Sequence, residues 1–392
     1  MPRSPLAAHW DLDPAITFLN HGSFGATPRR VLAAQSDFRA RMEAEPVRFL
    51  VREIEPLLDR SREALGALIH AETAGLVFVP NATTGVNSVL ASLTLAPGDE
   101  LLVTDHEYNA CRNALDETAR RTGARVVCVT LPFPVRDASE ITRAIASGFA
   151  PRTRLLLVDH VTSASALVLP IPEIVRAARE HGVDTLVDGA HAVGMVPLDL
   201  DAIAPAYYTG NLHKWLCTPK GSAFLWVHAD RRDAVRPLVI SHGANSARRD
   251  RSRFQIEFDW TGTDDPSAVL CIPEAIAFFD DIVGGVDRAI ARNRELALAA
   301  RDIVCDTLRV APSAPDSMIG SMAAIELPRN DIPLEPPLFV DPLQDALFAQ
   351  GIEIPVMPCP SPSGRVIRLS AQLYNHASEY QLLADALRVL VR

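Results

Sequence analysis

The sequence predicts an α/β fold, in which a large and mostly parallel sheet of seven strands has helices on both faces. Between about residues 30 and 262, short apolar runs alternate with amphipathic stretches, which is the order of strands and helices in such folds. Most of these runs are nearly continuous in Val, Leu and Ile, as is typical of strands buried on both faces. After Trp260 the pattern changes to long helical segments, so we expect a second, smaller α+β domain there.

The predicted large domain comprises residues 30–262. The 29 residues before it are rich in loops, and we expect them to cross between the two domains. Two helices of the large domain are predicted at 111–121 and 172–180, and Pro172 suits the first turn of a helix because no N–H is needed there. The seven predicted strands are 76–79, 100–104, 125–129, 154–159, 185–187, 206–208 and 223–227.

The predicted small domain comprises residues 263–392. Just before it, residues 254–260 carry an apolar side chain at every second position, which predicts a strand with one buried face. The domain itself is predicted to contain, in order, helices at 267–282 and 286–308, a proline-rich stretch at 312–337, a helix at 342–350, strands near 352–355 and at 365–370, and a helix at 379–391.

Composition excludes several classes of function. A chain of 392 residues with 48% apolar residues can bury a large core, but its net charge of −10 and the lack of a basic stripe argue against nucleic acid as a partner. No apolar run approaches the 18 residues of a membrane-spanning helix, and the first residues lack the apolar region of a signal peptide. The six cysteines are far apart and form no CxxC pair, so we expect a reduced, cytoplasmic protein without a disulfide framework or a metal site.

Lysine is almost absent from this chain. Lys214 and Lys220 are the only two, although lysine and arginine together number 38. Arginine neither loses its proton in a protein nor forms a Schiff base, whereas a lysine with a lowered pKa does both. Our first hypothesis is therefore that Lys214 carries a covalently bound aldehyde cofactor. The alternative is that both lysines are surface residues left over in an arginine-rich protein.

Polar residues follow several of the predicted strands at the point where each strand ends. Asn81 is a candidate N-cap, and Thr83 and Thr84 would then lie at a helix N-terminus, where the helix dipole favours a phosphate; ordinary helix capping is the alternative. Asp188 ends another strand, where a carboxylate can keep a pyridine nitrogen protonated; capping of the next turn is again the alternative. Because ligands of open α/β sheets bind beyond the carboxyl ends of strands, we expect these groups to converge on one edge. The other strand-end residues are His106, Tyr108, His160, Thr162, His191, Asn211, His213 and Lys214.

Four motifs resemble the class V pyridoxal-phosphate enzymes of the aspartate-aminotransferase fold, which is fold type I. They are NATT at 81–84, DGAH at 188–191, GNLHKW at 210–215 and TGTDD at 261–265. Two further motifs, FLNHGSFG at 18–25 and RVIRLSAQ at 365–372, are similar to the isopenicillin N epimerase-like branch of this family. The resemblance extends over almost the whole chain.

This resemblance implies pyridoxal 5'-phosphate as the cofactor, with Lys214 forming the internal aldimine and acting as the base at the substrate α-carbon. It implies that Asp188 pairs with the pyridine nitrogen and that Tyr108 stacks on the ring, where many class V enzymes have a histidine. The remaining residues that it assigns to the cofactor are Thr83, Thr84 and His213 at the phosphate, and His160 and His191 near the ring hydroxyl.

The resemblance also implies a substrate site and a dimer. Arg368 would bind the α-carboxylate of an amino-acid-type substrate, and Asn20 and His21 would lie in the same site. Thr263 would reach the cofactor phosphate of a neighbouring subunit, which makes a homodimer with shared active sites the expected assembly.

Several reactions are compatible with these residues. Epimerisation or C–S β-elimination is favoured, and transamination, cysteine desulfuration and oxidative decarboxylation–deamination are the alternatives on the same fold. A non-catalytic binding protein is the alternative of a different class. Cys359 precedes Arg368, as the catalytic thiol of a cysteine desulfurase does, but it lies between Pro358 and Pro360 without an obvious group to lower its pKa, which favours a packing role.

Overall fold

The seven predicted strands form one sheet in the computed structural model, which describes residues 3–329 and 341–391. The end of the predicted proline-rich stretch, residues 330–337, lies outside the described residues. The sheet order is β2-β8-β7-β6-β5-β3-β4, and every neighbouring pair is parallel except the two that involve β8. The predicted α/β class and the mostly parallel sheet are thus confirmed. The strands are β2 (Leu76–Val79), β3 (Glu100–Thr104), β4 (Arg125–Val129), β5 (Thr153–Asp159), β6 (Asp184–Asp188), β7 (Tyr207–Asn211) and β8 (Ala223–Val227).

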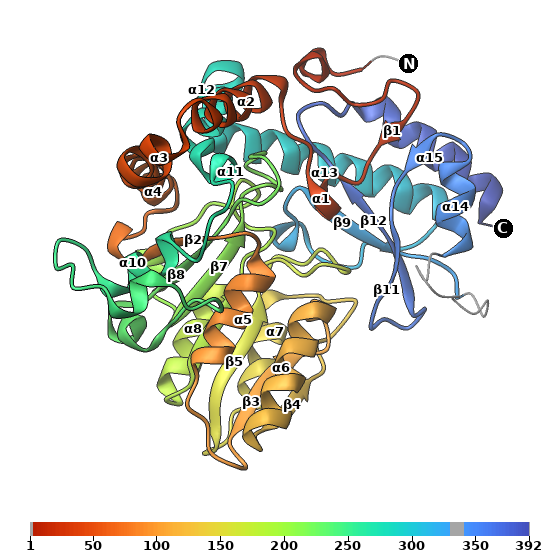
Figure 1. Ribbon diagram of the computed structural model, residues 1–392. Coiled ribbons are helices and arrows are strands. Elements are labelled where there is room, and N and C mark those ends of the chain that lie inside the picture. Colours follow the sequence, from red (N-terminus) through yellow and green to blue (C-terminus); the bar gives the residue numbers. More distant parts are fainter. Residues whose placement is uncertain (1–2, 330–340, 392) are drawn as a thin grey trace.

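Helices cover both faces of this sheet (Figure 1). Side chains alternate along each strand, so Leu101 and Val103 of β3 belong to one apolar cluster while Leu102 belongs to the other. The first cluster includes α5 (Ala82–Ser92), α6 (Asn109–Thr122) and α10 (Arg253–Asp259), and the second includes α7 (Ala138–Ala146) and α8 (Ile171–Glu180). Burial on both faces explains why the strands are nearly continuous in apolar residues.

The carboxyl ends of five strands meet at one edge of the sheet. β3, β5, β6 and β7 run parallel, and β2 shares their direction because it and β7 are both antiparallel to β8. The segments after these strands contain the polar residues that the sequence singled out.

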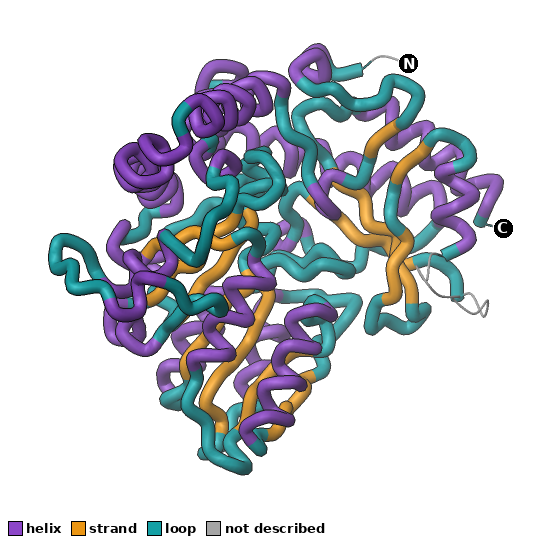
Figure 2. The backbone as a smooth tube through the Cα atoms, viewed as in Figure 1, coloured by secondary structure: helices purple, strands orange, loops and turns teal. Residues whose placement is uncertain are grey.

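A second, three-stranded antiparallel sheet lies in the C-terminal part of the chain (Figure 2). Its order is β11-β12-β9, and β12 coincides with the predicted strand at 365–370, whereas β9 and β11 were not predicted. The elements of this part are α11 (Ser267–Leu270), α12 (Ile272–Val283), α13 (Val286–Leu308), β9 (Met322–Glu326), α14 (Pro342–Phe348), β10 (Ile352–Glu353), β11 (Val356–Pro358), β12 (Arg365–Ser370) and α15 (Ala377–Leu390).

The N-terminal segment contacts both parts. β1 (Thr17–Phe18) pairs in parallel with β10, and the short helix α1 (His21–Phe24) follows it. Two helices next in the chain, α2 (Arg29–Ala44) and α4 (Ile54–Ile69), pack against α11 and α12. Because these contacts cross the predicted boundaries at 29 and 262, the division into domains stays a prediction.

The predicted strand at 254–260 is wrong, because these residues form helix α10. Ser252 caps it by accepting a hydrogen bond from the Gln255 backbone N–H, and Phe254 and Phe258, four residues apart, are buried on the same face. Apolar residues at every second position also include pairs that are four residues apart, which is the spacing of one helix face. The alternation therefore fits a strand or a helix, and the N-cap at Ser252 favours the helix. Among the helices of the described residues, none is long and apolar enough to cross a membrane.

Candidate active site

Lys214 lies in the segment after β7, and its amine contacts a histidine rather than an acid. Lys214 Nζ is 3.1 Å from His191 Nε2, and the indole N–H of Trp215 donates to His191 Nδ1 over 3.5 Å. Burial, together with the positive charges of Lys214 and Arg368, holds the pKa of His191 well below its usual value. A neutral His191 that accepts at Nδ1 has its proton on Nε2 and donates it to the lone pair of a neutral lysine.

The pKa of Lys214 agrees with this arrangement. Burial lowers it to about 8, the charge of Arg368 lowers it as well, and the charge of Asp188 acts in the opposite direction. About a tenth of Lys214 is therefore unprotonated at pH 7, far more than for an ordinary lysine, and the unprotonated amine is the nucleophilic form.

Asp188 is the last residue of β6 and is 1% exposed. The Ala190 backbone N–H donates to its Oδ1 over 2.9 Å, and the Cys111 thiol donates to its Oδ2 over 3.1 Å. Burial raises the pKa of Asp188 above its usual value, and these two hydrogen bonds and the charge of Lys214 oppose that rise. The alternative in which Asp188 only caps a turn thus explains the hydrogen bond of Oδ1 to Ala190 but not that of Oδ2 to Cys111.

Helix α5 begins at the same edge. Asn81 is its N-cap, and its side chain accepts from both the backbone N–H and the hydroxyl of Thr84, at 2.9 and 3.1 Å. Asn211, at the end of β7, accepts from the backbone N–H of Ala82 over 2.8 Å and so joins the helix to the Lys214 segment. Within the described residues no hydrogen bond engages the Thr83 hydroxyl, which leaves it available at the helix N-terminus.

The other predicted cofactor residues occupy different environments. His160 is buried and its Nδ1 is 2.8 Å from the Tyr208 hydroxyl, and burial lowers its pKa to about 4. His213 is half-buried beside Lys214, and its Nδ1 is 3.1 Å from the Ser222 carbonyl oxygen. Tyr108 immediately precedes α6 and is 45% exposed, so its ring is open to a ligand.

Arg368 reaches this edge from β12 of the second sheet. Its side chain is fully buried, and its Nη1 donates to the Ser163 carbonyl oxygen over 2.7 Å. Its Nη2 donates to Ser23 Oγ over 2.9 Å and to Asn20 Oδ1 over 3.4 Å. No carboxylate pairs with it among the described residues, its buried Nε has no acceptor there, and burial lowers its pKa to about 10. A buried cation without a counter-ion is a binding site for an anion.

Asn20 and His21 connect the two sheets to each other. The Asn20 amide donates to Glu353 Oε1 over 3.1 Å, and the fully buried His21 contacts the Tyr374 hydroxyl at 2.8 Å and the Lys214 carbonyl oxygen at 2.9 Å. Burial lowers the pKa of His21 to about 3, so His21 is neutral. Asn20 thus borders Arg368, whereas His21 supports the backbone of Lys214.

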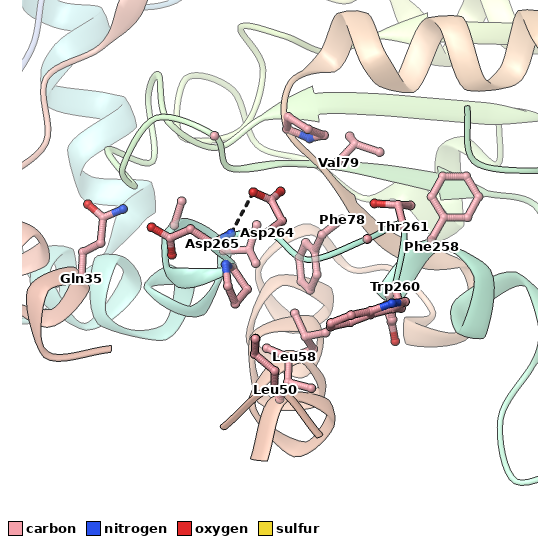
Figure 3. Close-up of a pocket in the computed structure, with 18 of the residues that line it drawn as sticks. Gln35, Leu50, Leu58, Phe78, Val79, Phe258, Trp260, Thr261, Asp264 and Asp265 are labelled. Carbon is pink, nitrogen blue, oxygen red and sulfur yellow. Dashed lines mark hydrogen bonds between the residues drawn. The ribbon is translucent and has the colours of Figure 1, made fainter. Parts of the chain in front are cut away.

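Thr263 does not join these residues. The loop from Thr261 to Asp265 is exposed along its whole length and starts directly after α10 and Trp260. Figure 3 shows Thr261 and Asp264 at the rim of a cavity of about 390 Å³, with Phe78 and Trp260 in its wall. The predicted site is therefore assembled within one chain, apart from this loop.

Three residues at this edge were not among the predicted site residues: Glu107, Cys111 and Asp159. Asp159 was visible as an acid at a strand end, but Cys111 had only the pattern of a buried helix residue. Cys359 is 6% exposed between β11 and β12, and burial raises the pKa of its thiol to about 12. It therefore lacks the accessible thiolate of a reactive cysteine.

The groups around Lys214 fit pyridoxal phosphate. The cofactor offers an aldehyde, a basic ring nitrogen and a phosphate, and the site offers an amine with a lowered pKa, a buried carboxylate and a helix N-terminus with a free hydroxyl. The unpaired guanidinium of Arg368 then remains for a carboxylate on the substrate.

Comparison with known proteins identifies the family. Residues 18–311 match the family described as Aminotransferase class-V. The chain is 36% identical to the isopenicillin N epimerase of Streptomyces clavuligerus over 97% of its own length and 96% of that protein. It is 33% identical to a probable chloroplastic L-cysteine desulfhydrase of Arabidopsis thaliana, over 97% of this chain and 84% of the other.

Solved structures share the fold. A mutant of the C–S lyase C-DES, with glycine covalently linked to the PLP cofactor, superposes with a TM-score of 0.81 at 22% identity, over 95% of this chain and 96% of that one. A cysteine desulfurase from Thermococcus onnurineus NA1 gives a TM-score of 0.80 at 17% identity, over 100% and 99%. The fold is thus fold type I, as the resemblance implied, and the chain belongs to the class V aminotransferase family of pyridoxal-phosphate enzymes.

Proposed function

We propose that the protein is a pyridoxal-phosphate enzyme that acts at the α- or β-carbon of an amino-acid-type substrate, by epimerisation or by C–S β-elimination. The observation that carries this proposal is the line of buried groups Asp188, Lys214 and Arg368: an acid, an amine with a lowered pKa and a guanidinium without a counter-ion. These are the partners that a cofactor ring nitrogen, an aldehyde and a substrate carboxylate require.

Lys214 has two tasks in this proposal. It would hold the cofactor covalently, and its neutral amine would remove the proton from the substrate α-carbon. When bound, pyridoxal phosphate supplies an electron sink for the negative charge that this removal leaves at the α-carbon. His191 keeps the amine oriented through its contact at 3.1 Å, and because its pKa is lowered well below the usual histidine value it is a much weaker base than Lys214 and does not compete for the proton.

Asp188 provides the negative charge that keeps the ring nitrogen protonated. Ala190 and Cys111 fix the orientation of its carboxylate with one hydrogen bond on each oxygen. The N-terminus of α5, with Thr83 and Thr84, and the neighbouring His213 would hold the phosphate, and the exposed ring of Tyr108 would be available to stack on the cofactor ring. His160 lies beside the ring hydroxyl with its Nδ1 engaged by Tyr208.

Arg368 selects substrates that have a carboxylate. Ser163, Ser23 and Asn20 hold its two terminal nitrogens, so the guanidinium is oriented before the substrate arrives. Asn20 itself is fixed by Glu353. The substrate then supplies the counter-charge that the protein does not provide.

The relatives favour two reactions over the others. Relatives named isopenicillin N epimerase and L-cysteine desulfhydrase are 36% and 33% identical to this chain, and the latter name denotes cleavage of a C–S bond. A desulfurase mechanism needs an accessible thiolate near Arg368, and the buried Cys359, with its raised pKa, does not support one.

The assembly that we propose is a homodimer with shared sites. The exposed loop that contains Thr263 contacts no other predicted site residue of its own chain, which is expected if it enters the site of a neighbour. The six unpaired cysteines support a reducing, cytoplasmic location.

Visible spectroscopy tests the proposal directly. Purified protein supplied with pyridoxal phosphate should be yellow, should lose its visible band on borohydride treatment, and should respond spectrally to some members of a panel of amino acids and cysteine conjugates. Release of sulfide or pyruvate identifies β-elimination, and exchange of the α-proton with solvent without net consumption identifies epimerisation. A protein that stays colourless would instead be the non-catalytic binding protein.

A further inference from the structure

Three carboxyl groups, rather than one, lie at the Asp188 end of the site. Glu107 follows β3, and Asp159 is the last residue of β5, paired in register with Asp188 on the adjacent strand. The nearest polar atoms of Glu107, Asp188 and the Cys111 thiol all lie within 4.8 Å of one another. The proposed function uses only Asp188, so Glu107 and Asp159 still need an explanation.

The surroundings of Glu107 and Asp159 do not suit a charged carboxylate. Both carboxyl oxygens of Glu107 are inaccessible to water and lack a well-formed hydrogen bond from the described residues, although other atoms of this residue are partly exposed. The same holds for Asp159 Oδ2, and Asp159 as a whole is 3% exposed. The Tyr108 backbone N–H is the one donor in the described chain that is close enough to lower the pKa of Glu107 and of Asp159, and burial outweighs it at both. Removing water from a carboxylate without replacing it by donors strongly disfavours the charged form, whereas a protonated carboxyl tolerates such surroundings.

The surrounding charges point the same way. Burial comes first, and the neighbouring acids second, among the causes that raise the pKa of Glu107 and of Asp159 well above their usual values. The opposing cations have smaller effects: Arg112, which acts on Glu107, is bound to Asp116 at 3.1 Å, and the effect of Lys214 on Asp159 is smaller than those of burial, Glu107 and Asp188. The titratable and charged groups that act on the two acids are Asp188 from β6, Cys111 and Arg112 from α6, and Lys214 from the segment after β7.

We propose that Glu107 and Asp159 are proton-storing positioning residues: both are neutral carboxylic acids in the folded protein, so that the cluster has a single negative charge, located on Asp188. Asp188 is the one that stays ionised because it alone of the three receives two hydrogen bonds, from Cys111 and Ala190. The inference rests on the proposed function in one respect: there, the negative charge of Asp188 pairs with the cofactor ring nitrogen. A second anion would instead draw a proton onto Asp188 and weaken this pairing.

Infrared difference spectroscopy of the cofactor-free protein tests the protonation state itself. Glu107→Gln and Asp159→Asn keep the shape of each side chain, and each should remove one carbonyl band of a protonated carboxyl group at neutral pH. The matched control is Glu117→Gln on α6, because Glu117 is exposed and bound to Arg120 at 2.7 Å. That variant should remove carboxylate bands only. Loss of carboxylate bands in the Glu107 and Asp159 variants as well would overturn the proposal.

Stability as a function of pH gives a second measurement. It remains informative for a destabilised variant, because the result is the change of the Tm difference with pH and not the Tm itself. A carboxyl whose pKa is higher in the folded than in the unfolded protein stabilises the fold fully below the unfolded value, and this contribution is lost as the pH rises towards the folded value. The contribution of Glu107 to the Tm of the wild type should therefore fall as the pH rises above the ordinary pKa of a glutamate. Glu107→Gln should not show this fall, so that the difference in Tm, variant minus wild type, becomes more positive as the pH rises. A difference that stays constant or becomes more negative would contradict a neutral Glu107.

Cofactor binding separates this inference from the proposed function. Because a neutral amide replaces a neutral acid, Glu107→Gln should keep the Kd for pyridoxal phosphate within about twofold, whereas Asp188→Asn should weaken it clearly. If Asp188→Asn bound the cofactor like the wild type, the proposed function would fail while the infrared result stood. Binding of one equivalent of Zn²⁺ by the cofactor-free wild type, with loss of the protonated bands, would show a metal site in place of a proton store.

Discussion

The two ends of the site on either side of Lys214 are built in opposite ways. At one end Asp188, on the large sheet, is surrounded by other acids and receives hydrogen bonds from a thiol and an amide. At the other end Arg368, on the small sheet, donates to neutral oxygens of Ser163, Ser23 and Asn20. Both charged side chains are 1% exposed, and neither has an ion-pair partner among the described residues.

This difference shows how one buried amine can serve two ligands. The acid end lacks a cation and the guanidinium end lacks an anion, so each is completed by a ligand of the opposite charge. Lys214 lies between them, and its pKa responds to both, lowered by Arg368 and raised by Asp188. We therefore expect the cofactor ring nitrogen to bind at the Asp188 end and the substrate carboxylate at the Arg368 end.

Removing the amine between the two ends should have the largest effect. Lys214→Ala and Lys214→Arg should show no measurable turnover, because neither side chain can form the covalent link or return a proton. Lys220→Arg is the matched control: Lys220 donates to the Gly25 carbonyl oxygen over 3.0 Å, which arginine can also do, so its turnover should be nearly normal. Steady-state assays that found the reverse pattern would assign the cofactor to Lys220.

Neutralising the acid end comes next. Asp188→Asn keeps the size of the side chain and should lower kcat by about 10²-fold or more, the scale of a lost electrostatic stabiliser. The visible band of the bound cofactor should shift as its ring nitrogen loses a proton. If kcat stayed near normal and the band did not shift, the role of Asp188 would be limited to capping the turn through its contact with Ala190.

The sequence predicted the acid end and the amine because they belong to continuous motifs at strand ends. It missed the residues Glu107, Cys111 and Asp159 that lie next to Asp188. Whether the side chain of Glu107 or of Tyr108 points into the protein depends on the backbone conformation after β3, and the residue pattern does not specify that conformation. Cys111 likewise shows only the spacing of a helix residue, and its role follows from the first turn of α6, which brings its thiol within 3.1 Å of Asp188 at the end of β6. The error at 254–260 had a different origin: the cap signal of Ser252 and Gln255 was present in the sequence but weighed less than the alternation.

The pH dependence of cofactor capture tests the balance between the two ends. With the pKa of Lys214 lowered to about 8, the neutral fraction of its amine falls as the pH drops below that value. The rate at which cofactor-free protein binds pyridoxal phosphate covalently should therefore rise about tenfold per pH unit below pH 8 and level off above it. Stopped-flow absorbance measures this rate. A rise that continues towards the ordinary lysine value of 10.5 would show that burial does not lower this pKa.

Weakening the guanidinium end should have a smaller effect that depends on the substrate. Arg368→Lys keeps a positive charge but loses the planar pair of donors, so KM for carboxylate substrates should rise about tenfold with less change in kcat. Arg365→Lys on the same strand is the control, because Arg365 is bound to Asp341 at 2.9 Å, and its KM should not change. An unchanged KM in Arg368→Lys would place the substrate carboxylate elsewhere.

The smallest effect on cofactor binding is expected from the loop at residues 261–265, which adds no residue to either end of the site within its own chain. Thr263 is exposed, so Thr263→Ala should leave the fold intact and weaken pyridoxal phosphate binding by about tenfold or less, as one hydrogen bond to a phosphate is lost; Thr261→Ala in the same loop is the control. If the loop serves a neighbour, a dimer of one Thr263→Ala and one Lys214→Ala chain has one site with both Lys214 and an intact Thr263. Co-expressed mixed dimers should then be more active at limiting cofactor than either parent variant. A fully active monomer in size-exclusion chromatography would refute the shared site and leave both ends of the pocket to a single chain.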